Sequence, residues 1–202
     1  MPTQAERSAA TRTRLLDATL DCLVELGWAG TSTTEVVARA GVSRGAQVHH
    51  FPTKEDLVLA AVEHLVDRRL AEYRAAFARL PDSERTTDAA FDLLRSQCGG
   101  PAMDAWFELA IAARTNAALH ERFVAVDRRF WDAALANLQE MFPEAAADPA
   151  LANLALRLSF CVVDGLSLGR LLDIDPAELD AVADTFKLLI APFAFRPQET
   201  LA

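Results

Sequence analysis

The residues best suited to chemistry in this sequence form a basic segment near the N-terminus. No Asp or Glu occurs from Val36 to Lys54, although the whole chain has 29 acidic residues among 202. The same segment contains Arg39, Arg44 and Lys54. Nucleic-acid phosphates require a local positive charge of this kind, which need not extend over the whole protein. The segment therefore predicts a nucleic-acid contact.

The residues around these charges predict two short helices joined by a tight turn. Ser32 and Glu35 form a capping box that can start the first helix. Gly41 can end that helix in the left-handed conformation, and Ser43 can cap a second helix over about residues 44–50. Two helices joined by a short glycine-containing turn form a helix-turn-helix unit, whose second helix fits the major groove of DNA.

At this point the sequence resembles the DNA-binding domain of the TetR family of bacterial repressors, over about residues 10–60. The residues that carry the resemblance are Thr31-Ser32, Ala40-Gly41-Val42-Ser43, Gly45, His50-Phe51 and Thr53-Lys54-Glu55-Asp56-Leu57. The resemblance implies an all-α fold with a three-helix DNA-binding head at 1–53 and a helical-bundle domain for ligand binding and dimerisation at 54–202. It also implies a homodimer that binds a palindromic operator and releases it when a small molecule binds.

The expected DNA contacts lie on the two short helices and at the start of the next one. Arg44 and Gln47 are expected to read bases. In family members a Leu-Tyr pair commonly stands where this chain has Gln47 and Val48, so the usual tyrosine contact is absent. Gln47 either reads adenine or packs where a leucine packs in relatives. The full set, in which Ser43, Thr33 and Lys54 hold phosphates, is Thr33, Thr34, Ser43, Arg44, Gly45, Gln47, His49, His50 and Lys54.

Enzyme motifs are weak in this sequence. Residues 41–45 match the G-x-S-x-G pattern of serine hydrolases, but that pattern needs a strand before the serine, and residues 33–40 read as a helix. A di-metal site in a helical bundle needs Glu-x-x-His pairs, and the chain has none; no nucleotide-binding fingerprint occurs either. The sequence therefore predicts a protein that is not an enzyme, with no metal and no cofactor.

The composition predicts a globular, all-helical chain with its acidity outside the head. Apolar residues make up 51% of the sequence, and Ala, Leu, Arg and Glu dominate, which favours helices. Residues 1–54 carry six Lys or Arg and five Asp or Glu, whereas residues 55–202 carry 14 and 24. A body with a net charge of −10 repels DNA. Contact with DNA should therefore be limited to the head.

The sequence predicts a cytoplasmic protein that does not span a membrane. The N-terminus is polar, without the apolar core of a secretory signal. The longest apolar stretch, residues 158–172, is interrupted by Asp164 and Arg170. The three cysteines, Cys22, Cys98 and Cys161, are widely spaced among apolar neighbours, which predicts buried, reduced thiols.

Apolar periodicity predicts helices over residues 12–27, 54–80, 84–97, 102–114 and 120–141, with two more after a loop at 143–149, while residues 1–9 look frayed. The last two helices carry apolar residues at 3-4 spacing, and the first of them has a second apolar stripe. A helix with two apolar stripes needs two partners, so we expect a homodimer there, although a bundle within one chain remains possible. The expected interface residues are Leu154, Leu158, Gly165, Leu168, Phe186 and Leu189.

The middle of the chain is rich in aromatic residues that could line a pocket. Apolar walls with a few polar groups are typical of ligand pockets, but aromatic residues at helical spacing more often form core. The expected effector is a small apolar or aromatic molecule, with a neutral or cationic one favoured by the acidic body. The expected pocket residues are Met103, Trp106, Phe107, Phe130, Trp131, Phe160 and Asp164. The alternative is a helix-turn-helix dimer with no small-molecule effector, which responds to a protein partner or is constitutive.

Overall fold

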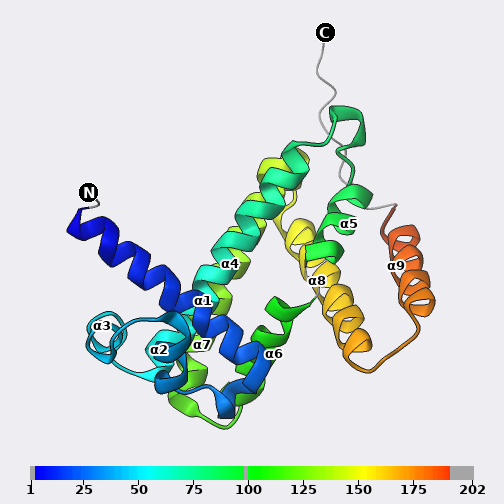
Figure 1. The fold of residues 1–202 in the computed structure, drawn as a ribbon. Helices are drawn as coiled ribbons and strands as arrows, with labels where there is room; N and C mark the ends of the chain where they lie inside the picture. The colour runs from blue at the N-terminus through cyan, green and yellow to red at the C-terminus, as the bar shows by residue number, and fades with distance from the viewer. Residues whose placement is uncertain (1–2, 98–99, 192–202) are drawn as a thin grey trace. The chain divides into compact units, whose positions relative to one another are not determined.

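The structure, a computed structural model, describes residues 3–97 and 100–191 (Figure 1). Within these ranges the regular elements are all helices, which confirms the predicted all-α fold class. The helices are α1 (Gln4–Gly30), α2 (Thr33–Ala40), α3 (Arg44–His50), α4 (Lys54–Ala78), η1 (Asp82–Glu84), α5 (Thr87–Gln97), α6 (Pro101–Ala113), α7 (Ala117–Met141), η2 (Pro143–Ala146), α8 (Pro149–Leu171) and α9 (Pro176–Ile190).

Helix α1 starts earlier than the sequence suggested. Thr3 and Glu6 form a reciprocal capping box, in which each side chain accepts a hydrogen bond from the other residue's backbone N–H. The expectation of a frayed start is therefore wrong from Thr3 onward. At the other end, Gly27 has the non-helical angles φ 65° and ψ −179°, so the regular helix breaks at the residue where the sequence predicted its end.

The helix-turn-helix unit has the predicted boundaries. The hydroxyl of Ser32 accepts from the Glu35 N–H at 3.1 Å, and the hydroxyl of Ser43 accepts from the Ala46 N–H at 3.2 Å. Gly41 lies in the left-handed region at φ 61° and ψ 39°, where a side chain would be strained. Local capping residues alone therefore define both helices.

The described chain divides into two compact units. The first unit contains residues 1–68 and 101–129, and the second contains residues 69–100 and 130–202. Helices α4 and α7 are continuous across the division. In the first unit, residues of α1 and α2 and Phe51 after α3 form a core that also includes Leu57, Ala61 and Leu65 of α4. The predicted head at 1–53 thus shares its core with the helix that follows it.

Helices α4 and α7 run parallel. In the first unit, Asp56 pairs with Arg122 at 2.8 Å, and Glu63 pairs with Arg129 one heptad further along both helices. In the second unit, the Arg74 Nε donates to the Asn137 Oδ1 at 3.0 Å. Because the contacts advance in the same direction along both helices, each helix holds its partner in register.

The second unit is built on α8. Its core includes Phe91 of α5, Val163 and Leu166 of α8, and Phe186 of α9. A Cβ on Gly169 would lie 2.7 Å from the Leu179 Cδ2, so glycine is what permits α9 to approach α8 this closely. The buried side chains of α8 thus pack on α5 and α9, and Phe160 of the same helix packs on Phe130 and Trp131 of α7.

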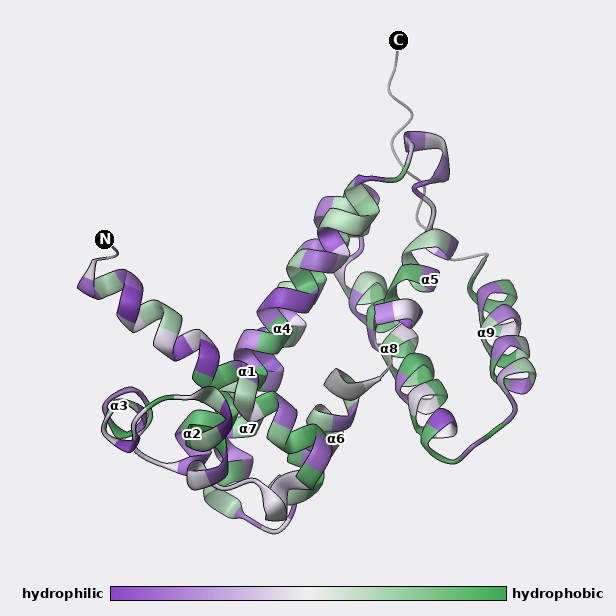
Figure 2. Cartoon of the chain, in the orientation of Figure 1, coloured by the Kyte–Doolittle hydropathy of each residue, from purple (hydrophilic) through white to green (hydrophobic). Residues whose placement is uncertain are grey.

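The opposite surface of α8 remains apolar and uncovered. By length and composition alone, Pro149–Leu171 could cross a membrane, although only 28% of its most apolar stretch is buried within the chain. Figure 2 shows the apolar residues of α8 in green along the helix. Asp164 and Arg170 interrupt this apolar surface. An exposed apolar surface suits a protein partner as much as it suits lipid.

Candidate nucleic-acid interface and effector site

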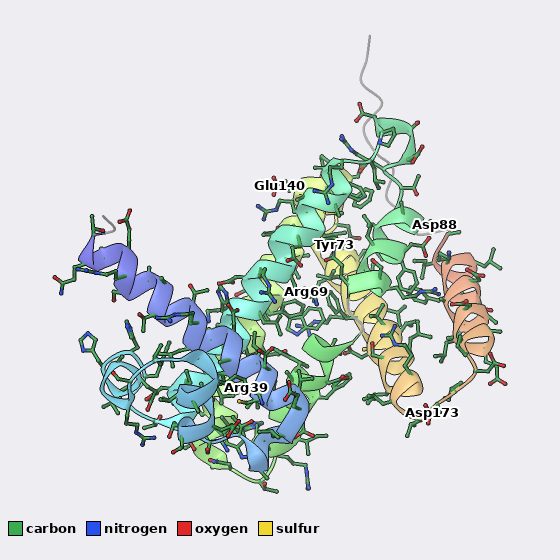
Figure 3. All side chains as sticks on the ribbon, viewed as in Figure 1. Arg39, Arg69, Tyr73, Asp88, Glu140 and Asp173 are labelled. Atoms are coloured by element: carbon green, nitrogen blue, oxygen red, sulfur yellow. The ribbon has the colours of Figure 1, made fainter. Side chains whose placement is uncertain are left out.

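The basic segment contains three cations, which have different environments. Arg39, labelled in Figure 3, pairs with Glu25 at 2.9 Å and with Glu35 at 3.7 Å, and the hydrogen bond to Glu25 raises the pKa of the guanidinium. Arg44 instead donates to the Thr33 hydroxyl at 2.6 Å. Arg44 is exposed and has no carboxylate partner among the described residues. It is therefore the cation of this segment best placed to meet DNA.

Most of the residues expected at DNA are accessible on α2 and α3. The hydrogen bond between Arg44 and Thr33 joins the N-terminal ends of these helices. Val48 is 46% exposed, which places the face of α3 that contains it outward. The exposed members of the predicted set are Thr34, Ser43, Arg44, Gly45 and His49, and the half-buried members are Thr33, His50 and Lys54.

Gln47 lies inside the head. Its side chain is fully buried, and the Nε2 donates to the carbonyl oxygen of Phe51. The Oε1 is buried without a hydrogen-bond partner. The prediction that Gln47 reads a base does not fit this position, because the amide cannot reach a groove while it fills the core. Burial supports the alternative in which Gln47 packs where relatives have leucine.

Lys54 contacts α1, although the sequence predicted that it holds a phosphate. The Nζ donates to the Trp28 carbonyl oxygen at 2.5 Å and lies 4.2 Å from the centroid of the Trp28 ring. Burial lowers the pKa of this ammonium group. The N–H of the same Trp28 donates to the Glu108 Oε2 at 2.9 Å. The backbone of a single residue next to the Gly27 break is thus held by both α4 and α6.

The environment of Ser43 does not support a hydrolase. The segment before Ser43 is helix α2 with a left-handed glycine, and the Ser43 hydroxyl caps α3. A nucleophile elbow requires a strand before the serine. In the described part of the chain, no group of three His, Cys, Asp or Glu side chains is arranged to hold a metal ion.

The expected pocket residues divide between the two units. In the first unit, Trp106 packs against Phe123 with ring centroids 4.7 Å apart. In the second unit, Phe130, Trp131 and Phe160 contact one another with centroids 5.1–5.2 Å apart; we call these three residues the aromatic cluster. Met103 and Phe107 are half-buried on α6.

Two charged groups lie on α8 on either side of Phe160. The Arg157 guanidinium lies over the Trp131 ring, 4.4 Å from its centroid, and sequence reasoning missed this residue. Asp164 has its Oδ1 buried without a hydrogen-bond partner. Burial raises the pKa of the Asp164 carboxyl to about 6. Because most buried carboxylates in proteins are hydrogen-bonded, Asp164 is an exception that requires an explanation.

The expected interface residues are mostly exposed in the single chain. Leu154 is 64% exposed and Leu189 is 69% exposed, and a Cβ on Gly165 would meet nothing within 4 Å. Leu158 and Leu168 are also exposed. Phe186 is different, because it packs on Phe91 at 4.8 Å between ring centroids and belongs to the core of its own unit. Phe186 was predicted to lie in the dimer interface, but its side chain is buried within the single chain.

The exposed surface of α8 also contains a thiol. Cys161 is exposed, contrary to the expectation of a buried thiol, whereas Cys22 is buried as expected. Cys98 lies outside the described residues. Cys161 follows Leu158 by three residues on the same helical stripe as Gly165 and Leu168.

A charged cleft of about 500 Å³ opens between α5, α8 and α9. Arg95 pairs with Asp180 at 2.8 Å, and Lys187 pairs with Asp92 and Asp184, each at 3.1 Å. The hydrogen bonds to Asp184 and Asp92 raise the pKa of the Lys187 ammonium group. These side chains neutralise one another and attach α9 to α5, which is a structural role.

Comparison with known proteins gives consistent results. The family model for bacterial regulatory proteins of the tetR family matches residues 15–61. The HTH-type transcriptional regulator BetI of Paraburkholderia phymatum is 31% identical over 195 residues, covering 91% of this chain and 94% of that one. An uncharacterized HTH-type transcriptional regulator of Mycobacterium tuberculosis is 35% identical over 119 residues, and the alignment spans 59% of this chain and 61% of that relative. The solved multidrug binding protein EbrR, complexed with ethidium, is 25% identical with a TM-score of 0.66, covering 89% of this chain and 98% of that chain.

The burial of Gln47 leads to a stability prediction. Gln47→Leu removes the unpartnered Oε1 at the cost of one hydrogen bond, so we expect the free energy of unfolding to rise by about 1 kcal/mol. Urea denaturation measures this change. Gln47→Glu, which has the same shape but buries a charge, should lower stability. A loss of stability in Gln47→Leu would mean that the bond to Phe51 outweighs the unpartnered oxygen.

The raised pKa of Asp164 leads to a pH-dependent prediction. The folded state binds the Asp164 proton more readily than the unfolded state, so wild-type stability is greatest below the ordinary Asp pKa and falls as pH rises through about 6. Asp164→Asn should therefore be more stable than wild type by about 1 kcal/mol at pH 8, a figure reduced for the partial exposure of the side chain. The difference should vanish near pH 4. Asp132→Asn, at an exposed position on α7, is the control for thermal denaturation at both pH values and should change little.

Proposed function

The chain belongs to the TetR family of bacterial regulatory proteins, and we propose that it is a cytoplasmic repressor that binds a palindromic operator as a homodimer and releases it when a small molecule binds. It is a helix-turn-helix transcriptional regulator, as its relatives are. The observation that carries the proposal is the exposed surface at the start of α3, within the acid-free segment 36–54, where Arg44 contacts Thr33 of α2. This surface has the charge and the helical shape that the major groove accepts.

On this proposal, α3 lies in the major groove and Arg44 reads a base. Arginine donates two parallel hydrogen bonds to the O6 and N7 of guanine, the commonest specific contact in the major groove. Binding requires Arg44 to exchange its bond to Thr33 for a bond to DNA, which leaves the Thr33 hydroxyl free for a phosphate. The remaining proposed contacts are Thr34, Ser43, Gly45, His49 and His50.

The homodimer forms through the uncovered apolar surface of α8 and α9. Exposed leucines at Leu154, Leu158, Leu168 and Leu189 favour a partner over solvent. Gly165 lies among them with open space above it, which permits close approach of a second α8. A twofold axis here presents two heads, so the operator must be palindromic with half-sites about one helical turn, or a multiple, apart.

Release requires the effector to favour a dimer whose heads do not fit both half-sites. A hundredfold loss of operator affinity needs a coupling free energy of about 2.7 kcal/mol, an ordinary value for allostery. The structural support is the contact of Trp28 with Lys54 of α4 and Glu108 of α6, since a shift of either helix must move α1. EbrR, which is described as a multidrug binding protein, holds ethidium in its solved structure, and this favours a small-molecule effector here.

The first functional prediction concerns Arg44. Arg44→Ala should weaken binding to the selected operator by about 5-fold to 150-fold, equivalent to about 1–3 kcal/mol, and relax specificity at one base pair. The operator is obtained by selection from random DNA, and affinity is measured by electrophoretic shift at fixed salt. Arg79→Ala, at an exposed position near the end of α4, is the control. Unchanged affinity and specificity in Arg44→Ala would remove this residue from the base-reading surface.

The second concerns the dimer. Gly165→Leu places a branched side chain where two α8 helices approach each other, so sedimentation velocity should show monomers. Within one chain the new side chain meets open space, so the fold should persist with an unchanged helical circular dichroism spectrum. Ala118→Leu, which introduces the same side chain at an exposed site on α7, should remain dimeric. A dimer that survives Gly165→Leu would place the interface elsewhere.

A further inference from the structure

The aromatic cluster of the second unit already holds one cation. Phe160 meets Phe130 at an interplanar angle of 90° and Trp131 at 77°, so ring edges and faces alternate. The Arg157 guanidinium lies 4.4 Å from the Trp131 centroid and has no carboxylate partner among the described residues. A tryptophan face attracts cations through its quadrupole, and the attraction grows when water is excluded. The cluster therefore provides a surface that suits positive charge.

The same helical face carries a carboxylate without a partner. Arg157, Phe160 and Asp164 follow one another at spacings of three and four residues, which places them on one side of α8. Arg157 and Asp164 lie about 10 Å apart along the helix axis, too far for an ion pair across Phe160. The Asp164 Oδ1 is buried and without a hydrogen bond in the described structure. A buried carboxylate oxygen in this state is complementary to a cation or a hydrogen-bond donor.

These observations together select a class of ligand. We propose that the effector is an organic cation with apolar substituents, held by the aromatic cluster with Asp164 as its counter-charge. The proposal rests on the effector response proposed above. The rings take the apolar surface of the ligand and the face of its charge, while the carboxylate gains the partner that it lacks. A neutral ligand leaves Asp164 unpaired, and an anion is repelled by it.

In the absence of ligand, the Arg157 guanidinium covers the face of the Trp131 ring that a cationic ligand would contact. An entering cation displaces the guanidinium from the ring, since two positive charges cannot share one face without repulsion. Arg157 is exposed and its other bond, from the Nε to the Asn153 Oδ1, is long at 3.3 Å, so the side chain can turn into water. Asp164 and Arg157 therefore have opposite effects on a cation, and these effects would be reversed for an anion.

The experiment measures ethidium binding to the full-length protein without DNA, by fluorescence titration at pH 8. Wild type should bind, Asp164→Asn should bind at least tenfold more weakly, and Asp132→Asn should bind as wild type does. Arg157→Gln should bind several-fold more tightly, because the Trp131 face becomes free. A general loss of folding would weaken ethidium binding in every variant. It therefore cannot explain weaker binding by Asp164→Asn together with tighter binding by Arg157→Gln.

A matched pair of competitors isolates the charge. Choline and 3,3-dimethylbutan-1-ol have nearly the same shape, but only choline is charged. Choline should displace ethidium at concentrations at least tenfold lower than the neutral alcohol, and Asp164→Asn should remove the difference. Equal displacement by both, equal affinity of Asp164→Asn and wild type, or no ethidium binding by wild type overturns the proposal.

Operator binding by the same variants is measured without ligand. All variants should retain it, because none alters the head. Operator binding by a wild type that binds no ethidium, or that binds it no better than Asp164→Asn does, would refute the cation site and leave the DNA-binding regulator standing. A protein that binds ethidium through Asp164 but selects no operator would instead refute the proposed function.

Discussion

The backbone of Trp28 is the constraint on which the head depends. Gly27 breaks the regular hydrogen bonding of α1, so the backbone N–H and carbonyl groups of Trp28 need partners outside α1. Glu108 of α6 accepts from its N–H and Lys54 of α4 donates to its carbonyl oxygen. The hydroxyl and the N–H of Thr31 both donate to the Gly27 carbonyl oxygen at 2.7 and 3.1 Å, which continues the chain into α2. The position of α2 is thus determined by two helices distant in sequence.

This arrangement explains why Lys54 opens α4 although a cation opposes the dipole at a helix N-terminus. The repulsion between the Lys54 charge and the helix dipole costs about 0.3 kcal/mol or somewhat more. A charge-assisted hydrogen bond to a half-buried carbonyl, together with the contact to the indole face, outweighs it. Loss of either Lys54 or Glu108 would leave one backbone group of Trp28 without its partner.

Local sequence signals predicted the helix-turn-helix well, because its helix ends are determined by neighbouring residues. Ser32, Gly41 and Ser43 act within a few positions of themselves, and the boundaries of α2 and α3 were predicted to the residue. The start of α5 was predicted three residues too early, at residue 84, although a local cap marks it: the Thr86 hydroxyl accepts from the Ala89 N–H at 3.2 Å.

The candidate sites were predicted only in part, because the positions of their residues depend on contacts between helices that are distant in sequence. The burial of Gln47 depends on the rotation of α3 about its axis, which polarity alone predicts wrongly. Phe186 carries the same apolar signal as Leu189, and only the position of Phe91 on another helix separates core from surface. Arg157 and Glu108 could not be identified from sequence, since each acts on a residue that is remote in the chain or on an adjacent helix.

The three tryptophans lie at different functional points of the molecule. Trp28 is beside the Lys54 ammonium group at the base of the head, Trp106 is against Phe123 in the first unit, and Trp131 is under Arg157 in the second unit. Indole emission responds to the field of nearby charges and to the loss of water. The protein therefore carries its own optical probes, and replacing any two tryptophans with phenylalanine leaves one. Such single-tryptophan proteins allow the events at the aromatic cluster and at the base of the head to be followed separately in time.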